Sequence, residues 1–391
     1  MLAVDTHWSS AKGGVSTFNR QLCIALAEAK AEVYCLVYEA SDQDRDDAET
    51  HRVHLRVADR RGRRPQSEAL MMRPDLPGGL RPDLIIGHGR VTGRIALAHR
   101  TNFYPDAAYF HVIHTSPDDI EWQKTDREDR PGIPGEQKWE DELELVTEAD
   151  RVFAVGPYLY DLAKEYVGGL EETLDPIQLD PGFDSRRQPA KRPSGRTKSI
   201  VIAGRLEDED IKGLDVAAHA IGVAVRLLGT AGKDIRFVLR GVPGKSAHEL
   251  HRRVAVWSDT PSLRVAFRGF SADPEKLWSD LARATLVLMP SRAEGFGLAG
   301  LEAITAGRPV LVSDRSGLAW LLDSVLDGRT SGIVVPVEQH PTRTPNAGVE
   351  KSPRWSVIPG PHLVGQPHSS TVCELRGHGR WPPRKFSMRG G

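Results

Sequence analysis

Two glutamates, Glu294 and Glu302, are separated by seven residues in the segment PSRAEGFGLAGLEAITAGRPVLVSD, residues 290–314. Glu294 lies in a glycine-flanked turn after an apolar run. Glu302 lies just over one turn inside the helix that the pattern predicts from about residue 298 to 306. Carboxylates in these places could accept hydrogen bonds from a hydroxyl-rich ligand. Glu294 could accept from the hydroxyls of a sugar, and Glu302 from the two hydroxyls of a ribose. The alternative is a pair of solvated carboxylates that the dipole at the helix start favours.

Two glycine-containing helix starts could bind an anion. Backbone N–H groups near Phe296, Gly297 and Leu298 would point toward a ligand in an adjoining cleft, because the first N–H groups of a helix have no partner inside it. Gly13 and Gly14 precede a second helix, whose apolar residues recur at three- and four-residue steps from residue 15 to 29. A bare Gly-Gly turn without a ligand explains that pair equally well.

A third strand-to-helix turn carries two cations. Arg205 and Lys212 flank the turn that follows the apolar run SIVIAG, residues 199–204. Two cations so placed can hold a diphosphate, because charge-assisted hydrogen bonds contribute about 1.5–3 kcal/mol each. The equally open alternative is a set of surface salt bridges with the neighbouring acidic residues Glu207, Asp208, Glu209 and Asp210.

Short apolar runs alternate with segments of helical period along the chain. Several runs are continuously apolar, as in strands covered on both faces. The alternation predicts an α/β fold in which helices cover parallel sheets. The predicted strands are residues 2–5, 32–38, 83–88, 109–114, 151–156, 199–204, 235–241, 263–269, 284–290 and 308–314.

The strands form two series, which predicts two doubly wound, Rossmann-like domains facing a central cleft. The first domain is expected at residues 1–183 and the second at residues 199–335. A polar, basic, proline-containing linker at residues 184–198 would join them. Such sheets bind ligands at the carboxyl ends of their strands, which is where the glycine turns and the two cations lie.

Composition and charge give no indication of several functions. The 391 residues carry a net charge of −1 with a pI near 6.9, which gives no reason to expect nucleic acid as a partner. Cys23, Cys35 and Cys373 lie far apart without a metal-ligand spacing, so neither a disulfide framework nor a zinc site is indicated. No apolar run approaches the roughly 18 residues that cross a bilayer, and the N-terminus lacks a signal-peptide pattern. We therefore expect a cytoplasmic protein without a metal.

The order GGVSTFNRQL, GRL…KGLD and EGFGLAGLEAITAGRPVL resembles the retaining GT-B glycosyltransferases of group 1, or family 4, whose signature is two glutamates separated by seven residues. The resemblance covers residues 1 to about 336. It implies a GT-B architecture with an acceptor-side first domain and a nucleotide-sugar-binding second domain. It also implies transfer of a sugar, with retention and without a cofactor or metal, from a nucleotide-sugar donor to an acceptor hydroxyl of a saccharide, lipid or small molecule.

The resemblance assigns donor-side roles to four side chains. Arg205 and Lys212 would bind the donor diphosphate and stabilise negative charge as the nucleotide leaves. Glu302 would hold the ribose and Glu294 the donor sugar. Catalysis would then rest on positioning and on electrostatic stabilisation of the leaving group.

The same resemblance implies contacts at the opposite wall. The backbone amides of residues 296–298 would contribute on the donor side, and Gly14 would approach the phosphates or the acceptor when the cleft closes. His114 resembles the histidine near the transferred sugar, with a core histidine as the alternative. His88 and Arg90 would lie on the acceptor side.

Other interpretations fit the same residues. A nucleotide-sugar sensor would keep the ribose and phosphate contacts without an acceptor site, and an epimerase or phosphorylase would act without a separate acceptor alcohol. The triplet Asp208-Glu209-Asp210 matches the DxD pattern that binds manganese in a different glycosyltransferase fold. Because it lies between Arg205 and Lys212, we interpret it as surface charge or as a brace for those cations.

Composition changes after residue 335. Residues 336–391 contain nine prolines and seven glycines, a share typical of disorder. Their net charge is +5, from eight Lys and Arg less three Asp and Glu, whereas residues 1–335 carry −6, from 44 less 50. We expect a largely disordered tail, domains less firmly oriented than in the family, and catalysis that is weak or absent even where donor binding persists. An electrostatic tether to the acidic body or a site for an anionic partner is the alternative.

Deletion of residues 341–391 tests the expectation for the tail. The truncated chain should keep the melting temperature and the donor affinity of the full chain, because a solvated tail contributes no packing. A melting temperature lowered by more than a few degrees, or tail amides protected from hydrogen exchange, would show that the segment is packed.

Overall fold

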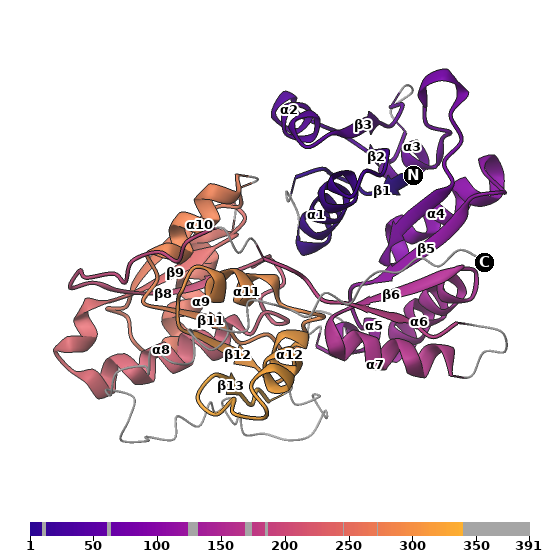
Figure 1. Ribbon diagram of the computed structural model, residues 1–391. Helices are drawn as coiled ribbons and strands as arrows, with labels where there is room; N and C mark the ends of the chain where they lie inside the picture. The colour runs from indigo at the N-terminus through magenta and orange to yellow at the C-terminus, as the bar shows by residue number, and fades with distance from the viewer. Residues whose placement is uncertain are drawn as a thin grey trace.

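The computed structural model describes residues 1–9, 13–60, 64–123, 132–168, 174–183, 187–244, 246–271 and 273–338. It contains two all-parallel sheets, each accompanied by helices (Figure 1). The predicted α/β fold with two doubly wound units is confirmed. The expected disorder of the tail lies, from residue 339 onward, outside the described residues.

The first sheet has the strand order β3-β2-β1-β4-β5-β6-β7. The order reverses between β1 and β4, and ligands of such sheets bind outside the carboxyl ends of the strands at this point. The strands are β1 (Leu2–Val4), β2 (Val33–Val37), β3 (Val53–Val57), β4 (Leu84–His88), β5 (Ala108–Ile113), β6 (Arg151–Val155) and β7 (Ile177–Leu179). The helices are α1 (Gly14–Glu28), α2 (Asp42–Thr50), α3 (Gln66–Met71), α4 (Gly89–Phe103), α5 (Pro117–Trp122), α6 (Gly132–Thr147) and α7 (Gly156–Val167).

The second sheet has the order β10-β9-β8-β11-β12-β13, with its own reversal between β8 and β11. Its strands are β8 (Lys198–Ala203), β9 (Ile235–Arg240), β10 (Arg264–Arg268), β11 (Leu286–Met289), β12 (Val310–Ser313) and β13 (Val334–Val335). Its helices are α8 (Leu214–Leu228), α9 (Ala247–Ser258), α10 (Pro274–Ala282), α11 (Leu298–Thr305) and α12 (Gly317–Val325). The stretch 187–197 between the sheets forms neither helix nor strand, and the domain limits at residues 183 and 199 stay predictions. Within the described ranges, none of the helices has both the length and the apolar character needed to cross a bilayer.

Three strands were not predicted from the sequence, namely β3, β7 and β13, and all three lie at sheet edges. An edge strand is covered less completely than a central one, so its residues need not form a continuous apolar run. In β3 only the first residue is buried, and β7 and β13 have three and two residues. Length and exposure together remove the pattern by which the central strands are recognised.

The two units pack against each other through α7 and α12, which lie next to each other in Figure 1. The rings of Tyr158 on α7 and Trp320 on α12 are 5.4 Å apart between centroids. Phe296, just before α11, is 4% exposed, and its ring would lie 2.6 Å from a Cβ added at Gly156, the first residue of α7. One hydrophobic cluster therefore runs without interruption from β5 and β6 into β11 and β12.

The backbones of the two units approach closely at Gly295, and Gly295→Ala tests how much the fold depends on this approach. A Cβ there would lie 2.0 Å from the carbonyl oxygen of His114, so one backbone must move. Overpacking of this kind costs about 1–3 kcal/mol, and we expect the melting temperature to fall by several degrees. The control is Gly195→Ala, because an added Cβ at Gly195 meets nothing within 4 Å. Equal melting temperatures for the two variants would contradict the prediction.

Candidate active site

Lys212 and Glu294 form an ion pair at the carboxyl ends of the adjacent strands β8 and β11. The Lys212 ammonium donates to Glu294 Oε2 at 2.5 Å, and the Ser291 hydroxyl donates to the same oxygen at 3.1 Å. The two charged side chains are only 22% and 20% exposed. The predicted phosphate-binding lysine and the predicted sugar-binding glutamate thus meet in one place, a contact between residues far apart in the sequence that pattern reasoning did not foresee.

Arg205 does not join that pair. Its side chain is 50% exposed, and its Nε lies 2.8 Å from Glu207 Oε1 and 3.4 Å from Asp208 Oδ2. These are the surface salt bridges that the sequence left open as an alternative to a diphosphate clamp. Of the two predicted cations, the structure brings only Lys212 to Glu294.

The turn that carries Glu294 is held by a buried pair that sequence reasoning missed. Arg292 is 2% exposed and donates from Nη1 and Nη2 to the two carboxylate oxygens of Asp215 at 2.9 and 2.7 Å. Its Nη1 also donates to the carbonyl oxygen of Asp210 at 2.8 Å. These bonds attach the turn after β11 to the start of α8, next to Lys212. The sequence shows a charged residue at each of two glycine-containing turns, Arg292 and Asp215, but it does not show that these two residues pair.

The two predicted helix starts face each other across the units. Gly13, with φ of 146°, precedes α1, and Gly297, with φ of 107°, precedes α11. A Cβ added at Gly14 would lie 3.1 Å from Leu298 Cδ1, so the first residues of the two helices are in contact range. The side chain of Phe296 instead packs into the interface between the units. The contribution of the amides of residues 296–298 to ligand binding stays a prediction.

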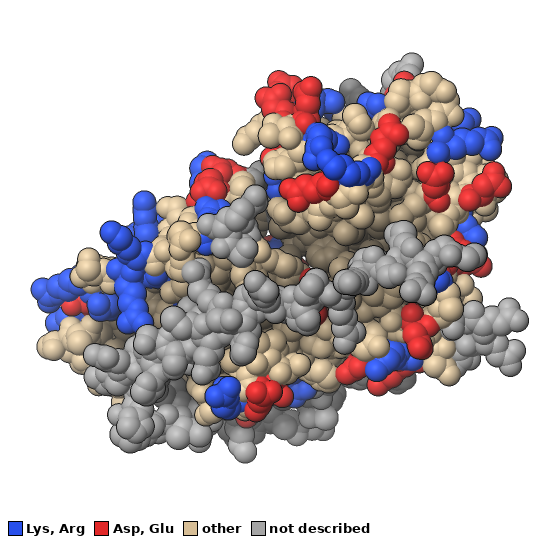
Figure 2. All heavy atoms as spheres, viewed as in Figure 1, with Lys and Arg blue, Asp and Glu red and all other residues tan. Residues whose placement is uncertain are grey.

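Glu302 lines an interdomain cleft of about 830 Å³, which α1 and α2 bound on one side and α10 and α11 on the other. Figure 2 shows a hollow between the two units whose visible wall is mostly uncharged, with the charged side chains gathered on the outer surfaces. Leu298 also lines the cleft, whereas Lys212, Glu294 and His114 lie outside its lining. Helix α11 thus connects the cleft, at Glu302, with the Lys212–Glu294 pair at its N-terminal end.

The Glu302 carboxylate makes no hydrogen bond or ion pair within the described part of the chain. Burial raises its pKa to about 7. A half-buried carboxylate without a protein partner has all its hydrogen-bonding capacity available for a ligand, and hydroxyl groups are donors that it can accept from.

His114 and His88 form a pair at the ends of β5 and β4, with 2.9 Å between His88 Nδ1 and His114 Nε2. His114 is half-buried, and His88 is 3% exposed. Arg90 does not take part, because it lies on α4 and its Nη1 is 3.6 Å from Asp141 on α6. Of the three residues expected on the acceptor side, His88 and His114 therefore contact each other, and Arg90 pairs with Asp141 instead.

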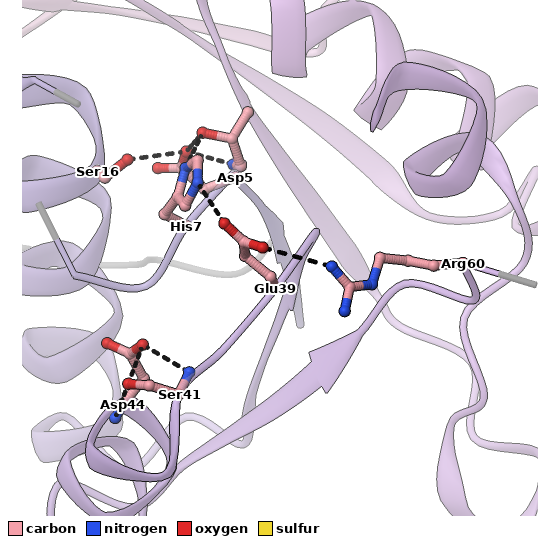
Figure 3. Close-up of polar contacts among 8 residues, drawn as sticks. Asp5, His7, Ser16, Glu39, Ser41, Asp44 and Arg60 are labelled. Atoms are coloured by element: carbon pink, nitrogen blue, oxygen red, sulfur yellow. Dashed lines mark hydrogen bonds and ion pairs between the residues drawn. The ribbon is translucent and has the colours of Figure 1, made fainter. Parts of the chain in front are cut away.

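A polar cluster follows the carboxyl ends of β1 and β2 in the first unit (Figure 3). His7 Nε2 lies 3.4 Å from Glu39, and the second oxygen of Glu39 lies 3.4 Å from Arg60. Burial raises the pKa of Asp5 to about 6, and its Oδ1 accepts from the Ser16 hydroxyl at 3.2 Å. Sequence analysis did not identify this cluster, because Glu39 and Arg60 come from segments separate from the turn that holds Asp5 and His7.

The acidic triplet at residues 208–210 has cationic partners. Asp208 pairs with Arg205, and Glu209 pairs with Arg253 on α9. No group of three or more His, Cys, Asp or Glu side chains within the described ranges has the geometry to hold a metal ion. The interpretation of Asp208 as a brace for Arg205 matches the contact, and independence from metals stays a prediction.

Two doubly wound parallel sheets that face a cleft form the GT-B architecture, and the Lys212–Glu294 pair lies at the strand ends of the second sheet. The chain belongs to the family described as family 4 glycosyltransferases in conflict systems, whose model matches residues 2–356. The match continues about 20 residues beyond the point, near residue 336, where the resemblance was expected to stop.

Individual relatives agree with this assignment. The chain is 28% identical over 270 residues to a D-inositol 3-phosphate glycosyltransferase of Corynebacterium efficiens, a match that covers 66% of this chain and 60% of the relative. It is 32% identical over 146 residues to an alpha-D-kanosaminyltransferase of Streptomyces kanamyceticus, over 37% of this chain and 33% of the relative. The chain thus spans less than two thirds of these curated relatives.

Solved structures share the fold. A sucrose-phosphate synthase from Thermosynechococcus elongatus superimposes with a TM-score of 0.63 at 18% identity, over 86% of this chain and 85% of the other. The Anabaena protein HepE, solved with UDP-glucose, superimposes with a TM-score of 0.57 at 17% identity, over 86% and 85% of the two chains. At these identities the likeness shows the fold alone.

The raised pKa of Glu302 gives a stability prediction whose sign is fixed. The folded-state pKa of Glu302, about 7, exceeds the ordinary value of about 4.3. The contribution of Glu302 to the free energy of unfolding therefore falls as pH rises between these values. Glu302→Gln removes the titration, so this variant should melt at least about 2–4 °C above the parent chain at pH 8 and level with it near pH 4.5. The exposed Glu165→Gln serves as the control and should show no such pH-dependent difference. A constant difference between Glu302→Gln and the parent across this range would contradict the assignment.

Proposed function

We propose that the protein is a retaining glycosyltransferase that moves a sugar from a nucleotide-sugar donor to an acceptor hydroxyl without a metal. The observation that carries the proposal is the arrangement along α11. A partly buried lysine–glutamate pair lies just before its N-terminal end, and Glu302, whose carboxylate has no partner among the described residues, lines the cleft one helical turn inside it. A charged group for phosphate and two carboxylates for hydroxyls thus lie on or next to one short helix.

The Lys212 ammonium would bind the donor diphosphate. It has three N–H groups, so it can keep its bond to Glu294 and donate to phosphate oxygens as well. As the bond between sugar and phosphate breaks, negative charge grows on the leaving phosphate, and a fixed cation in a partly buried site stabilises that charge more than water does. Glu294 would hold the donor sugar and Glu302 the ribose.

The proton of the acceptor hydroxyl would pass to the departing phosphate on the same face of the sugar, which yields retention without a protein nucleophile. The acceptor would enter from the first unit, where His114 and the polar cluster of Figure 3 lie. The protein's contribution is then orientation of two substrates, which can supply a large part of the rate enhancement.

The names of the relatives support this class of reaction. Those at 28% and 32% identity are named as enzymes that transfer sugars, one with an inositol phosphate and one with kanosamine in its name. The Anabaena structure was solved with UDP-glucose, which supports a nucleoside diphosphate sugar as donor. The donor sugar, the base and the acceptor are best sought with a thermal-shift panel of UDP-, GDP- and ADP-sugars.

Lys212→Ala and Arg205→Ala should each lower turnover by about tenfold or more, because the loss of about 1.4 kcal/mol of leaving-group stabilisation is tenfold in rate. Lys233→Ala, at an exposed lysine, is the matched control and should leave turnover unchanged. Turnover unaffected in both site variants would refute the diphosphate assignment. Activity should also survive EDTA, and a loss that manganese alone restores would instead favour the DxD interpretation of residues 208–210.

The same assays separate the other candidate activities. A saturable thermal shift with a nucleotide sugar but without turnover would identify a sensor. Product formed from the donor alone would identify an epimerase or phosphorylase. Product that requires both a donor and an acceptor alcohol, with the anomeric configuration kept, is the result expected for the proposed function.

A further inference from the structure

A continuous chain of hydrogen bonds links α1 to His114 through two buried side chains. Asn19 on α1 is fully buried, and its Oδ1 lies 2.9 Å from His88 Nε2. His88 Nδ1 in turn lies 2.9 Å from His114 Nε2. The Phe18 ring packs edge-on against both imidazoles, with centroids 5.0 Å from His114 and 6.2 Å from His88. Each bond is of normal length, so each must have one donor and one acceptor.

The orientation of the Asn19 amide decides the direction of the chain. Asn19 Nδ2 donates to the Cys35 sulfur at 3.5 Å, and Oδ1 accepts from the Cys23 thiol at 3.6 Å. In the structure it is Asn19 Oδ1 that faces His88 Nε2, and an amide oxygen can only accept. His88 must carry its proton on Nε2.

The position of the ring proton on His114 follows from that on His88. A neutral His88 with a proton on Nε2 offers a lone pair at Nδ1, so His114 must donate from Nε2. A neutral His114 then has an unprotonated Nδ1. This nitrogen has no partner within the described part of the chain, and the half-buried side chain lies where the His114 carbonyl adjoins Gly295 of the second unit.

The surroundings keep both imidazoles neutral. Burial, together with the neighbouring His111, lowers the pKa of His88 to about 3. Burial, His88 and His111 hold the pKa of His114 well below its ordinary value. His111 itself lies 2.8 Å from Glu142 on α6, a carboxylate that faces His111 rather than the His88–His114 pair. Both rings are therefore neutral at physiological pH, and each offers one N–H donor and one lone pair.

We propose that Asn19 is a positioning residue which, through His88, fixes the Nε2–H tautomer of His114, so that Nδ1 accepts a hydrogen bond from a substrate hydroxyl. This inference rests on the proposed function for the identity of the substrate. It also limits what His114 can touch. A lone pair at Nδ1 attracts the O–H group of a sugar or an acceptor alcohol and repels a phosphate oxygen, so the diphosphate is left to Lys212.

The tautomer can be measured without any substrate. Two-bond ¹H–¹⁵N correlation spectra of the full chain distinguish protonated from unprotonated ring nitrogens, and the signals missing in His114→Gln assign the residue. We expect a protonated Nε2 and an unprotonated Nδ1 at neutral pH in the parent chain. The opposite tautomer or an imidazolium would overturn the proposal.

Removal of the Asn19 amide tests its role. Asn19→Leu, or Asn19→Ala if the larger side chain prevents folding, deletes the acceptor that holds the His88 proton, and the Nδ1–H form of His114 should then become populated. An unchanged His114 pattern would overturn the proposal. Asn102→Leu, the same replacement at an exposed position on α4, is the control.

Kinetics supply an independent readout. The Asn19 variant should turn over about fivefold or more slowly, the effect of losing one ordinary hydrogen bond, whereas Asn102→Leu should match the parent. An altered tautomer with unchanged turnover would overturn the catalytic relevance of the relay. If the parent chain shows no turnover with any donor and acceptor, the proposed function fails, and the spectra alone decide whether Asn19 sets the tautomer.

Discussion

The site depends on how closely three backbone turns can approach one another. A Cβ at Gly213 would lie 2.0 Å from the carbonyl oxygen of Pro290, and a Cβ at Gly295 would lie 2.0 Å from that of His114. Gly213 also has φ of 64°, which favours glycine in its own right. These two contacts bring the Lys212 loop, the Glu294 turn and the His114 strand end together. The constraint is steric, so no rearrangement of side chains alone could satisfy it with larger residues.

The ion pairs near the site are of two kinds, buried pairs that hold its turns together and exposed pairs that contribute little. Arg292 and Asp215 are nearly buried and bidentate, and losing one partner of such a pair leaves an uncompensated charge, which typically costs about 3–5 kcal/mol. Arg205 and its acidic neighbours are about half exposed, where ion pairs contribute about 1 kcal/mol or less. Arg292 therefore ties the turn that carries Glu294 to the start of α8, next to Lys212. Arg205 is the cation with freedom to turn toward a ligand.

The sequence predicted the parts of this molecule that depend on local pattern. Central strands, the helix starts at Gly14 and Leu298, and the two glutamates were found because apolar period and glycine placement are local signals. Edge strands β3, β7 and β13 were missed because exposure and shortness weaken those signals. The Lys212–Glu294 and Asn19–His88 contacts join residues 82 and 69 positions apart, and such partners are decided by how separate elements pack. Motifs therefore named Lys212, Glu294 and His88 but not Asn19, and packing determined which side chains meet.

The candidate site holds its polar groups in two different states, which bear on the proposed sugar-nucleotide donor. Among the described residues Glu302 has no hydrogen-bond or ion-pair partner for its carboxylate, and burial raises its pKa to about 7, so ionisation of Glu302 is costly. Under the proposed function, two ribose hydroxyls that donate to Glu302 would favour the charged form and lower its pKa, so binding of the donor would release a proton. His114 and His88 behave differently, because a protein relay already satisfies one side of each ring and burial keeps them uncharged. In the part of the chain that the structure describes, the Glu302 carboxylate thus has no partner, whereas His88 and His114 have hydrogen-bond partners within the protein. The protonation of Glu302 would therefore change when a ligand binds, while the orientation and tautomer of His114 would stay the same.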